Sequence, residues 1–113
     1  MAEEGLALLE KAAGQGHAYA MYELGGIYRA MKEYEQARKW YTMGAKAGVP
    51  RAKFYLGQLL SKGVGVAADY PAAADWFRRA ADAGDADGAQ NLAAMYSIGR
   101  GRAGPIMPAC LII

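Results

Sequence analysis

Residues 48–84 read GVPRAKFYLGQLLSKGVGVAADYPAAADWFRRAADAG. In each half of this stretch, small and large apolar residues recur every three or four positions, which is the spacing of one face of an α-helix. The segment Gly63-Val-Gly65 separates the halves, and Gly84 follows the second one. The stretch therefore predicts two antiparallel helices joined by a short glycine loop.

The same pattern occurs on both sides of this stretch. When Leu24, Leu56 and Leu92 are aligned, a small residue stands four positions before each leucine and another directly after it, and a large residue stands four positions after it. A second pattern is built around Trp40 and Trp76, each of which is followed by an aromatic residue and then by an alanine and a glycine. Internal repetition of this kind predicts a solenoid, in which neighbouring helix pairs bury each other's apolar faces.

The two patterns predict an all-α fold of about six helices. The expected helices lie near residues 2–14, 17–30, 33–47, 50–62, 69–83 and 86–98. Pro50 and Pro71 fall in expected first turns, and Asp69 and Asp85 are expected N-caps. Left-handed glycines are expected to end most of the helices, at Gly14 or Gly16, Gly48, Gly63, Gly84 and Gly99.

The chain length of 113 residues suits one domain. We expect a repeat domain over residues 1–103 and an apolar tail over residues 104–113. The domain divides into an N-terminal helix (2–14), two repeats (17–47 and 49–83) and a half repeat (86–98). The first repeat lacks four loop residues that the second one has between its helices.

The second repeat resembles the SEL-one-like repeat, a relative of the tetratricopeptide repeat with a longer loop between its helices. The resemblance covers about residues 5–101, with one departure, since Ala72 stands where the family has a basic residue. It implies a right-handed α/α superhelix of antiparallel helix pairs, which holds partners on a concave surface. The matching positions are Ala52, Leu56, Gly57, Gly63, Gly65, Val66, Asp69, Ala73, Trp76, Ala80, Ala81 and Gly84.

Composition excludes several classes of function. The formal net charge of +2 is too small for a nucleic-acid-binding protein, which needs a dense basic face. No apolar run approaches the ~18 residues of a membrane-spanning helix. The N-terminus lacks the pattern of a secretory signal, which slightly favours the cytoplasm, although a fragment of a periplasmic or secreted protein would look the same.

No set of residues predicts catalysis, a cofactor or a metal site. His17 is the only histidine, and no nucleophile stands near it in a motif. Cys110 is the only cysteine, so neither an internal disulfide nor a cysteine metal site is possible. Gly63-Val-Gly65 lacks the lysine and the further glycine of a phosphate-binding loop, and it joins two helices rather than a strand and a helix.

A partner-binding surface is expected on the first helix of each pair, as in the related tetratricopeptide geometry. Its cations would suit an acidic ligand or a C-terminal carboxylate. Two alternatives remain: the aromatic side chains pack between helices, and the cations are ordinary solvated charges. The expected residues are Tyr19, Tyr22, Arg29, Arg51, Phe54, Gln58, Lys62 and Gln90.

The last repeat is incomplete, and the tail over residues 104–113 carries no charge. Leu92 and Tyr96 therefore lack the second helix that usually covers them. The tail would act as an irregular cap, mark a truncated array, or pair with a second copy. We expect a monomer, or a weak dimer formed through this end.

The predicted function is a protein–protein interaction scaffold that binds a peptide or protein segment. A rival is an enzyme, because cysteine-paired secreted relatives of this family have been associated with penicillin binding and hydrolysis. This chain lacks the cysteine pairs, which disfavours that rival. A third reading is a structural fragment of a larger regulator.

Overall fold

A computed structural model of the chain describes residues 2–64 and 66–97. This part of the chain forms six helices, which begin and end within one residue of the expected positions wherever both ends are described. The end expected at residue 98, Gly99 and the tail over residues 104–113 lie outside the described residues. The helices are α1 (Ala2–Gly14), α2 (Ala18–Ala30), α3 (Tyr34–Lys46), α4 (Pro50–Lys62), α5 (Tyr70–Asp82) and α6 (Ala86–Ser97).

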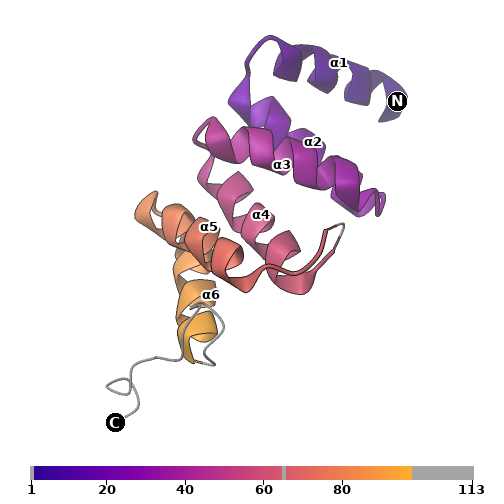
Figure 1. Cartoon of the computed structure of the whole chain (residues 1–113). Coiled ribbons are helices and arrows are strands. Elements are labelled where there is room, and N and C mark those ends of the chain that lie inside the picture. The colour runs from indigo at the N-terminus through magenta and orange to yellow at the C-terminus, as the bar shows by residue number, and fades with distance from the viewer. Residues whose placement is uncertain (1, 65, 98–113) are drawn as a thin grey trace.

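Consecutive helices run antiparallel and stack into an elongated body that measures 55 × 25 × 17 Å (Figure 1). Each helix packs against its neighbours in the chain, and α2 also contacts α4. We call α2, α4 and α6 the A helices and α1, α3 and α5 the B helices. The predicted solenoid of antiparallel helix pairs is confirmed.

The helix ends follow the residues predicted to set them. Asp69 caps α5, because its carboxylate accepts a hydrogen bond from the amide of Ala72 at 3.1 Å. Left-handed glycines follow α1, α3, α4 and α5, at Gly16, Gly48, Gly63 and Gly84. In the shorter loop of the first repeat, Lys32 adopts this conformation, with φ of 63°. This conformation is sterically unfavourable for a residue with a Cβ atom, and Lys32 adopts it because the loop is short.

Two glycines let an A helix approach the B helix that follows it. A Cβ atom on Gly25 would lie 2.5 Å from the ring of Tyr41, and one on Gly57 would lie 2.8 Å from the ring of Phe77. Tyr41 and Phe77 are 0% and 1% exposed, so each ring fills the space that a glycine leaves. The glycine after Leu24 and the glycine after Leu56 therefore set how closely the two helices of each repeat pack.

The burial of the three aligned leucines decreases toward the C-terminal end of the described array. Leu24 and Leu56 are 0% and 3% exposed. Their counterpart Leu92 is only half-buried, and Tyr96 is 37% exposed. The aligned leucine of α6 is thus less buried than its counterparts in α2 and α4, while Met95 of the same helix is 7% exposed.

Candidate binding surface

A row of aromatic rings crosses from α2 to α4. The ring of Tyr19 lies 5.2 Å from that of Tyr22, and Tyr22 lies 6.2 Å from Tyr55 on the next A helix. Tyr41 reaches the row from α3 and stacks on Tyr55, with ring centroids 5.4 Å apart. We call this part of α2 and α4 the A-helix face. Large, stiff rings of this kind present contact area at a low cost in conformational entropy.

Arg29 is held in place on this face by two aromatic residues. Its Nε donates a hydrogen bond to the hydroxyl of Tyr41 at 3.1 Å, and its guanidinium lies 4.7 Å from the centre of the Tyr55 ring. The hydrogen bond to Tyr41 outweighs partial burial and raises the pKa of Arg29. Burial raises the pKa of the Tyr41 hydroxyl above its usual value, against the influence of Arg29. Both groups therefore keep their protons at neutral pH.

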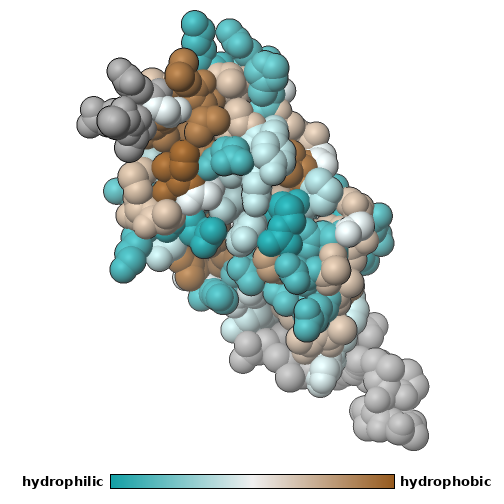
Figure 2. Space-filling model, turned by 180° about the vertical axis from the view of Figure 1, so that it is seen from behind, coloured by the Kyte–Doolittle hydropathy of each residue, from teal (hydrophilic) through white to brown (hydrophobic). Residues whose placement is uncertain are grey.

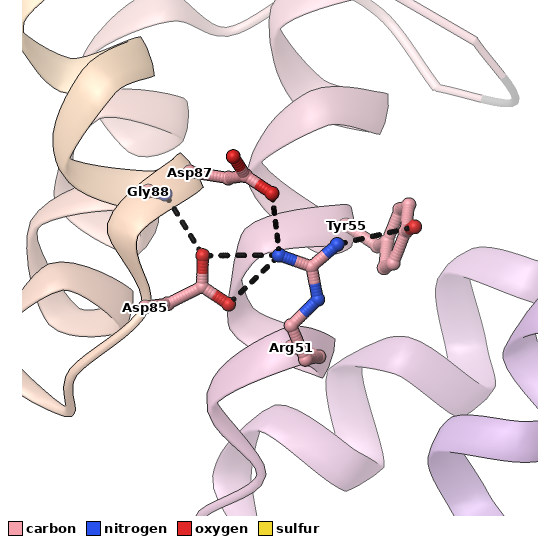
Figure 3. A network of polar contacts seen from close by, with 5 residues as sticks. All are labelled: Arg51, Tyr55, Asp85, Asp87 and Gly88. Atoms are coloured by element: carbon pink, nitrogen blue, oxygen red, sulfur yellow. Dashed lines mark hydrogen bonds and ion pairs between the residues drawn. The ribbon is translucent and has the colours of Figure 1, made fainter.

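Arg51 joins α4 to the start of α6 (Figure 3). Its Nη1 donates to both carboxylate oxygens of Asp85, at 3.1 and 3.0 Å, and to Asp87 at 2.9 Å. Asp85 also caps α6, since it accepts a hydrogen bond from the amide of Gly88 at 2.9 Å. Burial acts to lower the pKa of Arg51, but its hydrogen bonds to Asp85, Asp87 and Tyr55 outweigh this and raise it. Two carboxylates thus neutralise Arg51 within the chain.

Three hollows lie along the aromatic row, and one of them, of about 330 Å³, is lined by residues of α2 and by Tyr41. The other two lie at the ends of the row. The first has a volume of about 220 Å³ and lies where α2, α3 and α4 meet. The second has a volume of about 520 Å³ and lies at the loops between the repeats, beside Tyr19 and Arg51. The first is lined by Arg29, Tyr34, Tyr55, Gln58, Leu59, Lys62 and Val64.

Comparison with known protein families shows which family this chain belongs to. The model of the Sel1 repeat matches residues 2–17, 18–49 and 50–85, which together make up most of the chain. The chain belongs to the Sel1 repeat family. Proteins with Sel1 repeats are commonly non-catalytic scaffolds that bind protein partners.

Two solved structures closely resemble this Sel1 array. One is a Sel1 repeat protein from Oxalobacter formigenes, 34% identical with a TM-score of 0.84. The other is a protective antigen of uropathogenic Escherichia coli with an SLR fold, 35% identical with a TM-score of 0.82. Each match covers 88% of this chain, but only 43% and 22% of those chains, respectively. A comparison with curated proteins finds no match.

The Sel1 array brings together most of the residues predicted from the sequence. Tyr19 is 62% exposed and Tyr22 is partly buried beside it. Arg29, Gln58 and Lys62 line the hollow of about 220 Å³. Gln90 is exposed on α6 and lies outside all three hollows.

Phe54 follows the alternative expectation, in which an aromatic side chain packs between helices, and not the outward-facing one. Its side chain is only 6% exposed, and its ring centre lies 5.9 Å from the ring centre of Phe77. The guanidinium carbon of Arg51 lies 4.6 Å from the centre of the Phe54 ring. Successive helical residues point about 100° apart, so the next residue, Tyr55, takes the outward place. Phe54 is thus a core residue that supports Arg51.

Sequence reasoning missed Tyr55, although a signal was present. Four polar or aromatic residues of α4 follow each other at intervals of four, three and four positions, which places them along one stripe of the helix. They are Arg51, Tyr55, Gln58 and Lys62. Reading this stripe as a unit would have replaced Phe54 by Tyr55. The ion pairs of Arg51 with Asp85 and Asp87 had no local signal, because these partners lie in the next helix pair.

Outside the A-helix face, the described surface has an apolar region but no arrangement typical of a metal site or a membrane-spanning helix. Figure 2 shows hydrophobic side chains gathered toward the end of the molecule where α1 lies, where Leu8 is 68% exposed. Within residues 2–64 and 66–97, no group of histidine, cysteine and acidic side chains is arranged to hold a metal ion. None of the described helices is long and apolar enough to cross a membrane.

Proposed function

We propose that this chain is a protein-interaction module without catalytic activity, and that the A-helix face binds a peptide or protein segment of a partner. One observation carries the proposal: exposed and partly buried tyrosines form a continuous row between two hollows, with cationic side chains beside it. Tyrosine and arginine are the residue types that dominate binding energy at protein interfaces.

The shape of the surface supports an extended ligand. The row from Tyr19 to Tyr55 spans two A helices, so a ligand that contacts all of it must itself be long. A segment of polypeptide has this length, and it offers side chains to the hollows. This chain spans less than half of either related structure, so its own residues supply the support for the proposal.

Selection from a random-peptide display library tests the proposal. We expect the chain to retain specific peptides, and Tyr19→Ala to weaken their binding about tenfold or more, as loss of an interface hot spot does. Met43→Ala is the matched control, because Met43 is 44% exposed on α3 and lies outside all three hollows. Failure to select any peptide, or equal binding by Tyr19→Ala, would refute the proposal for this face.

A further inference from the structure

The hollow where α2, α3 and α4 meet has an unbalanced charge. Arg29 and Lys62 both line it, and none of the described residues that line it is acidic. Within the described part of the chain, neither side chain forms an ion pair with a carboxylate. Two positive charges from different repeats therefore share one hollow of about 220 Å³ without an ion-pair partner among the described residues.

Arg51 provides an internal contrast. It lies on the same stripe of α4 as Lys62, but Asp85 and Asp87 bind it at 3.0 and 2.9 Å. The chain thus neutralises the cation at the N-terminal end of this stripe and leaves the one at the C-terminal end free. The hollow around Arg29 therefore differs from the rest of the A-helix face, because its cations lack a carboxylate partner among the described residues.

The preference of helix C-termini for positive charge does not by itself explain how Arg29 and Lys62 are placed. Arg29 and Lys62 lie in the last turns of α2 and α4, where the helix dipole favours a positive charge. The dipole, however, does not require the guanidinium of Arg29 to be fixed. Its hydrogen bond to Tyr41 uses Nε and its stacking on Tyr55 orients the plane, while both terminal nitrogens stay without a hydrogen bond to any described residue. Such a group is oriented in advance to bind a carboxylate.

We propose that the hollow formed by Arg29, Gln58 and Lys62 binds an acidic side chain, aspartate or glutamate, of the partner's peptide segment. The proposal rests on the proposed function and specifies its ligand. Arg29 and Lys62 supply the charge, and the Gln58 amide offers a further donor at the same wall. Leu59 and Val64 provide apolar surface for the methylenes of that side chain. A side chain suits this place better than a chain end, because the aromatic row continues from the hollow toward Tyr19.

Peptides selected from the display library, synthesised with acetylated N-termini and amidated C-termini, test this inference. We expect the selected peptides to be enriched in aspartate and glutamate relative to the input library. Lys62→Gln should weaken their binding about two- to fivefold, the range for a solvent-accessible ion pair, and the effect should shrink at high salt. Arg29→Gln combined with Lys62→Gln should weaken it about tenfold. Lys39→Gln is the control, since Lys39 is exposed on α3, outside the hollow.

The possible outcomes separate the two proposals. Peptides that bind without acidic residues, or that bind Lys62→Gln as tightly as the unaltered chain, would overturn the acidic ligand while leaving the interaction module intact. Binding that requires a free C-terminal carboxylate would overturn the assignment to a side chain. If no peptide binds at all, the proposed function fails first and the acidic ligand fails with it. Lys62 makes no hydrogen bond or ion pair to other described residues, so Lys62→Gln decides even if an Arg29 variant folds poorly.

Discussion

At the scale of single residues, two positions that contact each other differ together between the two repeats: the first repeat has Arg29 and Tyr41 where the second has Ser61 and Phe77. Tyr41 and Phe77 occupy equivalent places, each packed against a glycine of the preceding helix. Tyr41 carries a hydroxyl into a position with 0% exposure, and Arg29 supplies its hydrogen bond. At the position equivalent to Arg29, the second repeat has Ser61, and Phe77 needs no polar partner. Arginine and tyrosine therefore form a unit that the second repeat replaces as a whole.

The Arg29–Tyr41 unit predicts non-additive effects on stability. Arg29→Ser leaves a buried hydroxyl without its partner and should cost about 1–3 kcal/mol. Tyr41→Phe leaves only the exposed Arg29 without its partner and should cost about 0.5–1.5 kcal/mol. The double variant carries the residue pair of the second repeat, so its cost should fall short of the sum by about 1 kcal/mol. Urea unfolding of all four proteins measures this coupling, and additive effects would contradict it.

At the scale of elements, glycine determines how closely paired helices approach. Gly57 faces the ring of Phe77 and the backbone oxygen of Ala73 on α5, which lie 2.8 and 3.2 Å from the place of a Cβ atom. The ring can shift by changing its side-chain torsions, but the backbone oxygen moves only with the helix. Gly5, in contrast, has nothing within 4 Å of that place and is exposed on α1. The same substitution should therefore act in opposite directions at these two helical glycines.

Gly57→Ala should destabilise the chain by about 1–3 kcal/mol, because the added methyl group overpacks the contact between α4 and α5. Gly5→Ala should be neutral or stabilise by up to about 1 kcal/mol, since alanine favours an exposed helix interior. Urea unfolding followed by circular dichroism measures both changes. Equal destabilisation by the two variants would mean that helix propensity or the unfolded chain, rather than close approach, governs the glycine positions.

The same elements explain what the sequence predicted and what it did not. Helix ends were predictable because glycine, proline and aspartate act locally, as at Gly63, Pro50 and Asp69. The outward face of α4 was harder to predict, because its rotation depends on packing against both α3 and α5. That rotation buries Phe54 and exposes part of Tyr55. Arg51 forms ion pairs with Asp85 and Asp87, which lie in the next repeat. The residue spacing within one repeat therefore cannot predict these ion pairs.

At the scale of the whole molecule, the array is close to one-dimensional. The body is 55 Å long and only 17 Å thick, and apart from α2 with α4 its main contacts join helices that follow each other in the chain. In such arrays, stability is approximately a sum of repeat and neighbour terms. A change at one end should therefore loosen that end without loosening the other. Asp85 allows this to be tested, because it caps α6 and connects it to Arg51 on α4.

Asp85→Ala should accelerate amide hydrogen exchange in α6 by roughly ten- to a hundredfold, which corresponds to the loss of about 1–3 kcal/mol from a cap and a buried hydrogen bond. Exchange in α2 and α3 should change little, since the side-chain hydrogen bonds of Asp85 in the described part of the chain go to Arg51 on α4 and Gly88 on α6. Asp75→Ala is the matched control: Asp75 pairs only with exposed Arg78 and Arg79 on its own helix, and such pairs contribute little. Exchange measured by NMR resolves the helices separately. Equal acceleration in all helices would mean that the array unfolds as one cooperative unit, and the A-helix face would then lose its shape whenever α6 detaches. Confinement of the effect to α6 would mean that the aromatic row and the hollow around Arg29 stay formed while the end of the array opens.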